Sequence, residues 1–164
     1  MLFRSVTLQA SQAALGNYSS GTQTATFTAA KEAQTITFAA PSSPVNYGVT
    51  PVALSGSASS GLPVTWSVVS GPASISGSTL TITGAGTIVV GADQSGNTNY
   101  ATATQVTHSI TVNKIAPATG LTASPNPVQA QSVVTLTATV SSSVSTPTGS
   151  IVFSDGGTTL GTAT

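Results

Sequence analysis

A pattern of residues that returns after 82 positions constrains the fold of this chain more than any other feature. The series Ala10-Ser11-Gln12, Asn17-Tyr18 and Thr22-Gln23 returns as Ala92-Asp93-Gln94, Asn99-Tyr100 and Thr104-Gln105. After a one-residue insertion, Thr28 and Lys31 match Thr111 and Lys114. Solenoid coils and propeller blades repeat over only about 20 to 50 residues. The longer period suits a small β-sandwich domain, whose usual size is about 100 residues.

This period divides the chain into three parts. Residues 1–32 are expected to be the last two strands of a unit whose beginning is missing, and residues 33–115 form one complete unit. Residues 116–164 begin a different unit that stops before its sandwich closes. The sequence therefore predicts a fragment of a longer tandem array, in which Met1 is an internal start or a gene-call artefact rather than a true terminus.

Short alternating runs fill the complete unit. Apolar residues alternate there with Thr and Ser, and Gly or Pro separates the runs, which is typical of half-buried strands rather than helices. The predicted strands are residues 34–38, 51–55, 63–69, 73–76, 78–83, 86–92 and 105–112. The side chains predicted to face inward are Ile36, Phe38, Val52, Leu54, Val64, Trp66, Val68, Ile75, Leu80, Ile82, Ile88, Val90, Ile110 and Val112. The predicted fold class is all-β, and Trp66, the only tryptophan, is expected at the centre of the core.

The near absence of charge excludes several functions. Charged residues are 4 % of the chain and cancel to a net charge of zero, whereas ordinary domains contain about 25 %. Nucleic acids and anionic membranes require a basic face, so neither is expected as a partner. No apolar run of about 18 residues predicts a membrane span, and Ser5, Thr7 and Gln9 interrupt any signal-peptide core. A neutral surface covered with hydroxyl groups favours an extracellular protein.

The joints between the units are short. Residues 28–33 and 114–117 lead almost directly from the last strand of one unit to the first strand of the next. Such linkers leave little slack, so successive units should stack end to end as a rod.

A resemblance to a known family rests on two stretches of sequence. After a strand over 133–140, the C-terminal part reads Gly149-Ser150-Ile151-Val152-Phe153-Ser154-Asp155-Gly156-Gly157-Thr158-Thr159-Leu160-Gly161-Thr162-Ala163. This part resembles the front half of a bacterial immunoglobulin-like (Ig-like) domain of the group 3 kind. The middle unit ends with Asn99-Tyr100-Ala101-Thr102-Ala103-Thr104 and then Ser109-Ile110-Thr111-Val112-Asn113-Lys114, which is similar to the closing motif of Ig-like repeats in large bacterial surface and secreted proteins. The resemblance implies tandem sandwiches that act as stalks, spacers, adhesive modules or carbohydrate-associated modules, without catalytic residues.

The expected core follows from the same comparison. In antibody-type domains a buried tryptophan packs on a cysteine pair from the second and sixth strands. The corresponding positions in this chain are Leu54 and Val90, and the chain contains no cysteine. We therefore expect Leu54, Trp66, Val90 and Ile110 to form the structural core without a disulfide.

Two groups of residues are candidate functional sites. His108, the only histidine, would form a hydrolase site with Asp93 and a serine, but no Gly-x-Ser-x-Gly motif is present and the earlier repeat has Ala25 and Ser11 at these positions. A structural role for His108 is favoured. The candidate ligand loop contains Asp93, Asn97, Asn99 and Tyr100. It offers oxygens for calcium but only one carboxylate, so an ordinary turn-rich loop is the default.

Tyr18 and Tyr100 recur at the same loop position. Capping one end of the core is favoured over stacking on a sugar. Asn17-Tyr18-Ser19 forms a glycosylation sequon, which chance explains if the source is bacterial.

The sequence thus predicts a non-enzymatic spacer or stalk module of a large bacterial cell-surface or secreted protein, with no cofactor. The alternative is an adhesive or carbohydrate-binding module. Expected partners are the neighbouring Ig-like domains of the same chain, and surface glycans or host matrix proteins for the alternative. The expected location is extracellular or at the cell surface, with signal and anchor outside this sequence.

Overall fold

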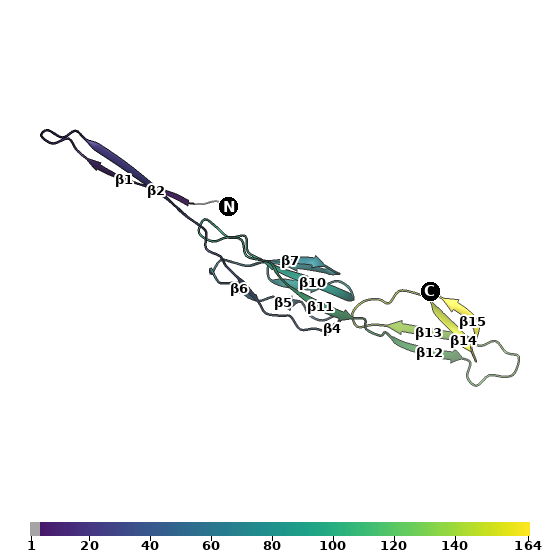
Figure 1. Cartoon of the computed structure of the whole chain (residues 1–164). Helices are drawn as coiled ribbons and strands as arrows, with labels where there is room; N and C mark the ends of the chain where they lie inside the picture. Colours follow the sequence, from purple (N-terminus) through teal and green to yellow (C-terminus); the bar gives the residue numbers. More distant parts are fainter. Residues whose placement is uncertain (1–3) are drawn as a thin grey trace.

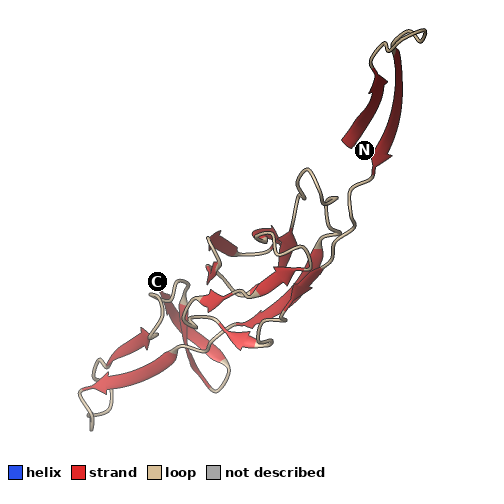
Figure 2. Ribbon diagram, turned by 90° about the vertical axis from the view of Figure 1, so that its left-hand side faces the viewer, coloured by secondary structure: helices blue, strands red, loops and turns tan. Residues whose placement is uncertain are grey.

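The computed structural model of the protein describes residues 4–164, so the interpretation of Met1 lies outside the described residues. Strands make up 54 % of the structure, and the described part contains no helix. The strands form a complete Ig-like β-sandwich flanked by two partial units. The three parts follow one another along the long axis of the molecule (Figures 1 and 2). The proposed boundaries at residues 32/33 and 115/116 stay predictions.

The central sandwich contains nine short strands in three sheets. They are β3 (Ile36–Phe38), β4 (Val45–Asn46), β5 (Val52–Ala53), β6 (Gly56–Ala58), β7 (Thr65–Ser70), β8 (Ala73–Ser76), β9 (Thr79–Ile82), β10 (Gly86–Asp93) and β11 (Val106–Asn113). One sheet has the order β4-β11-β10-β7, and the others have the orders β3-β6 and β5-β9-β8. All pairs are antiparallel except β11 with β4.

The core lies between these sheets. Leu80, Ile88, Val90 and Ile110 are its largest fully buried side chains, and they come from β9, β10 and β11. Each side chain predicted to face inward either belongs to this core or packs against it half-buried. Burial of apolar surface stabilises the sandwich by about 25 cal/mol per Å², so the core rather than any charged pair holds the unit together.

Trp66 does not lie at the centre of the core, contrary to the sequence interpretation. It is half-buried and packs against the core, where its ring and that of Phe38 meet edge to face. The reason is topological, because β7 is one of the two edge strands of its sheet. Its inward side chains have a neighbouring strand on one side only and therefore stay partly exposed. The aliphatic residues of β9, β10 and β11 occupy the centre instead.

Two strands of the central unit were missed, and several are shorter than predicted. Residues 41–48 and 56–61 read as turns, yet they contain β4 and β6. The strand predicted over 51–55 is reduced to β5, so Leu54 lies between β5 and β6 rather than within a strand. Leu54 is nevertheless buried, and its backbone amide donates to Ser78 O over 2.8 Å.

The two outer units consist of hairpins. At the N-terminal end β1 (Arg4–Gln12) pairs with β2 (Gly21–Ala29) along its whole length. At the C-terminal end β12 (Ala118–Ser124) pairs with β13 (Thr135–Ser141), and β14 (Ile151–Asp155) pairs with β15 (Thr158–Ala163). The run Asp155-Gly156-Gly157, a turn signal in the sequence, connects the last two strands. Each outer unit is therefore part of a sandwich and not a closed one.

Candidate functional site

The candidate ligand loop connects β10 to β11 at one end of the central sandwich. Asp93 is its only carboxylate, and both carboxylate oxygens accept hydrogen bonds from the protein. Ser67 Oγ donates to Oδ2 over 3.1 Å, and Gln105 Nε2 donates to Oδ1 over 2.8 Å. The carboxylate therefore ties β7 and the end of the loop to β10.

The tip of the loop is closed by Asn97. Its Oδ1 accepts from the backbone amides of Asn99 and Tyr100 over 2.8 and 2.9 Å, and its own amide donates to Tyr100 O over 3.1 Å. Asn side chains form such turns readily because the short amide mimics a backbone carbonyl. The structure therefore brings Asn97, Asn99 and Tyr100 together in one turn, in which the Asn97 oxygen is occupied by backbone donors.

Two buried glutamines, Gln34 and Gln94, bind the backbone of this loop through hydrogen bonds. The sequence analysis did not identify them as functional residues. Gln94 Oε1 accepts from Gln34 Nε2 over 3.0 Å and also from the Gly96 amide, while Gln94 Nε2 donates to Pro63 O over 3.0 Å. Gln34 Nε2 also donates to Ala101 O, and Gln34 Oε1 accepts from Ser60. The signal that marks Gln94 is its recurrence as Gln12 in the repeated pattern.

The candidate ligand loop also pairs through its backbone with the segment that follows the N-terminal hairpin. Glu32 N donates to Asn99 O, and Ala101 N donates to Glu32 O, each over 2.8 Å. These two bonds form a parallel bridge between Glu32 and Tyr100. The loop proposed as a ligand site thus contributes its backbone to the joint between two units.

His108 takes part in contacts with the core. Its Nε2 lies 3.1 Å from Phe38 O, and the two rings meet edge to face with centroids 4.6 Å apart. Asp93, its partner in the hydrolase reading, is bonded to Ser67 and Gln105 instead. This arrangement favours the structural role over the serine-hydrolase reading.

The described residues also lack a metal cluster and a membrane-spanning helix. Residues 4–164 contain no group of three or more His, Cys, Asp or Glu side chains able to hold a metal ion. No described helix is long and apolar enough to span a bilayer. Tyr18 is 76 % exposed in the β1–β2 connection, whereas Tyr100 is half-buried. The two recurring tyrosines therefore lie in different environments.

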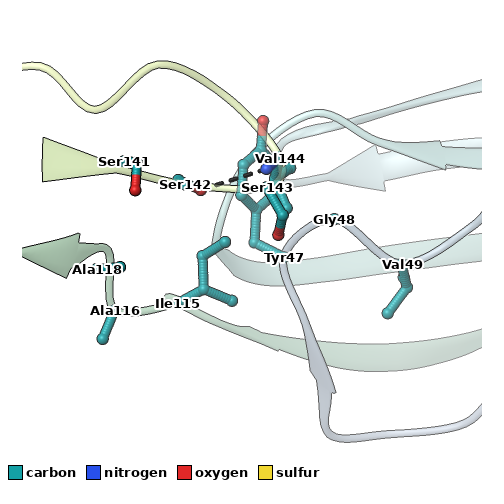
Figure 3. Close-up of a pocket in the computed structure, with 10 residues that line it drawn as sticks. All are labelled: Tyr47, Gly48, Val49, Ile115, Ala116, Ala118, Ser141, Ser142, Ser143 and Val144. Carbon is teal, nitrogen blue, oxygen red and sulfur yellow. Dashed lines mark hydrogen bonds between the residues drawn. The ribbon is translucent and has the colours of Figure 1, made fainter.

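A hollow of about 760 Å³ lies at the joint between the central and C-terminal units. Figure 3 shows the uncharged residues that line it, which are Tyr47, Gly48, Val49, Ile115, Ala116, Ala118, Ser141, Ser142, Ser143 and Val144. Val144 packs so closely on Gly48 that a Cβ added at Gly48 would lie 2.3 Å from Val144 Cγ2. With hydroxyl and apolar groups alone, this hollow offers contact between units but no acid, base or activated nucleophile.

Comparison with family models, curated proteins and solved structures returned no match to this chain.

Proposed function

We propose that this chain is a non-enzymatic spacer of a larger bacterial cell-surface or secreted protein, built from Ig-like units of the bacterial type. The observation that carries this proposal is the extended order of its parts. The N-terminal hairpin, the central sandwich and the C-terminal unit succeed one another along one direction (Figures 1 and 2). Such a shape provides reach rather than an enclosed site.

The contacts at both joints support the proposal. The Glu32 backbone bonds to Asn99 and Ala101 fix the entry to the central unit. At the exit, Val144 packs on Gly48, whose φ of +94° permits this close approach. Joints with several contacts resist bending better than flexible linkers do, and a spacer needs this stiffness.

The surface chemistry agrees with an extracellular location. A chain with 4 % charged residues carries hydroxyl groups where other domains usually carry charge. The side-chain oxygens of Asp93 and Asn97 in the candidate loop already accept hydrogen bonds from Ser67 and Gln105 and from the loop backbone. Ligand binding would therefore have to compete with bonds that stabilise the fold.

A second candidate function, an adhesive or carbohydrate-binding module, is favoured by Tyr18. This ring is largely exposed, and exposed aromatic rings provide flat apolar surfaces on which a ligand can stack. Glycans and matrix proteins are the ligand classes for this alternative.

Small-angle X-ray scattering of the full chain tests the spacer. We expect an extended particle, and a variant in which Gly and Ser replace residues 114–117 should show a broader distribution of lengths at unchanged central stability. A globular particle would contradict the spacer. Binding to a panel of glycans and matrix proteins that is lost in Tyr18→Ala would favour the adhesive module instead, with Tyr100→Ala as the comparison at the half-buried position.

A further inference from the structure

The N-terminal hairpin exposes an apolar face. Leu8 on β1 is 58 % exposed and Phe27 on β2 is 53 % exposed, and Phe27 lies opposite Val6 in the pairing. The two strands form a sheet of their own, and in the described residues each is paired only with the other. The face is therefore available for packing.

The central sandwich shows how a hairpin of this kind is normally covered. β10 pairs with β11 so that Ile88 lies opposite Ile110 and Val90 opposite His108, just as β1 pairs with β2 to place Val6 opposite Phe27 and Leu8 opposite Ala25. These positions correspond through the offsets of 82 and 83 residues in the sequence pattern. Ile88 and Ile110 are fully buried, since they pack in one cluster with residues of β3 and β9.

The C-terminal unit contains the first strands of a sandwich but, in the described residues, no pair that corresponds to β10 and β11. Its β12 pairs with β13, as β3 pairs with β6 in the central unit, and its β14 pairs with β15 alone. A cleft of about 300 Å³ lies between the two hairpins, and its apolar lining includes Leu121, Leu136 and Phe153. In the central unit, the next strand, β7, pairs with β10 in antiparallel fashion.

We propose that the β1–β2 hairpin of one copy docks on the C-terminal unit of a second copy, with β1 adding in antiparallel fashion to β14. Leu8 and Phe27 would then enter the cleft beside Leu136 and Phe153, as Val90 and Ile110 enter the core of the central unit. The resulting sheet would have the order β2-β1-β14-β15, with the last two strands from the second copy.

The occupant is a second copy because the hairpin and the cleft lie at opposite ends of the chain, separated by the central sandwich (Figures 1 and 2). The lengths of β1 and β14 proposed to pair, residues 5–12 and 151–154, contain no charge, and Arg4 and Asp155 stand only at the strand ends. These edges therefore lack most of the charged side chains that commonly keep exposed edges apart. A head-to-tail contact uses a different surface on each copy, so it builds open chains unless the rotation between copies closes a ring. With the two surfaces at opposite ends of an elongated molecule, we expect linear chains. A spacer that stays monomeric would contradict this proposal and leave the proposed function unaffected.

Light scattering and sedimentation of the full chain over a concentration series test the contact. We expect the average mass to rise above the 16.0 kDa of one chain as concentration increases. Leu8→Ser should weaken the association at least about tenfold. Leu15→Ser is the matched control, because Leu15 is an exposed leucine of the same hairpin that lies in its connection, and it should leave the association unchanged. A monomer at every concentration, or equal behaviour of the two variants, would overturn the proposal.

Mixing two variants tests the head-to-tail order. Leu8→Ser keeps an intact cleft, and Phe153→Ser keeps an intact hairpin even if its C-terminal unit is disordered. Each variant alone should be a monomer, while the equimolar mixture should form dimers and no longer chains. Dimers of Phe153→Ser alone would mean that hairpins pair with hairpins. A mixture that stays monomeric would mean that the cleft does not bind the hairpin. Either result would contradict the proposal.

Discussion

Gln34 and Gln94 meet inside the central sandwich, where Gln34 Nε2 donates to Gln94 Oε1 over 3.0 Å across 60 residues of sequence. Both residues are buried, and their remaining bonds reach Pro63, Ala101, Gly96 and Ser60. No buried side-chain nitrogen or oxygen in the described part of the chain lacks a partner. The pair therefore links the segment before β3 to the β10–β11 loop by hydrogen bonds.

Gln94→Ala should destabilise the central unit by about 2 kcal/mol, because it leaves buried polar groups of Gln34 and Pro63 without partners. Urea unfolding followed by Trp66 fluorescence measures the change. The matched control is Gln12→Ala, since Gln12 holds the corresponding place in the repeated pattern but is exposed, and its unfolding midpoint should be that of the wild type. Equal effects of the two substitutions would show that burial of the glutamine pair contributes nothing.

Trp66→Ala should cost about 3 kcal/mol, the lower end of the range for large aromatic residues, because the ring is only half-buried. The ring lies with its centroid 4.8 Å from that of Phe38 and packs on Gly56, where an added Cβ would be 2.9 Å away. Trp66→Phe should cost about 1 kcal/mol because most of this contact survives. Calorimetry compares the variants, and an unchanged melting temperature for Trp66→Ala would contradict the packing role.

The alternating pattern was sufficient to predict the long strands and the direction of their side chains. Ile88, Val90 and Ile110 face the core because side chains alternate between the two faces of a strand, a local property that the sequence expresses directly. The repeat in the sequence also predicts the correspondence between the β1–β2 and β10–β11 pairings. Local periodicity and internal repetition are therefore enough to predict β10, β11 and the faces that their side chains occupy.

The missed features depend on tertiary partners. Residues 56–58 read as part of a Gly- and Ser-rich turn, and they form a strand only because β3 pairs with them. The place of Trp66 at the rim depends on the order of strands in the sheet, which alternation does not reveal. The hydrogen bonds of Asp93 and Asn97 likewise form only in the folded loop. The sequence could therefore identify these residues as candidates but could not predict which groups they bond.

Gly71→Ala should destabilise the central unit by at least about 2 kcal/mol. Gly71 has a φ of +97°, and an added Cβ would lie 2.3 Å from Thr87 O and 2.7 Å from Ile88 Cα, both of which are backbone atoms that cannot rotate away. Gly61→Ala is the control, because Gly61 has a φ of +74° but open space around its Cβ position; it should cost about 1 kcal/mol. Similar denaturation midpoints for both variants would refute the close approach at Gly71.

Hydrogen exchange should separate the closed sandwich from the partial units. Amides of β10 and β11 lie beside the buried core and should exchange only by global unfolding, whereas those of β1, β2 and β12 to β15 should exchange by local opening, because few buried apolar contacts hold these hairpins. Mass spectrometry of peptides at low protein concentration measures this difference. At high concentration, protection should rise in β1 and β14 but not in β15, since β1 and β14 are the strands that would form new backbone hydrogen bonds between copies. Uniform protection of all units at low concentration would contradict the assignment of the outer units as partial sandwiches.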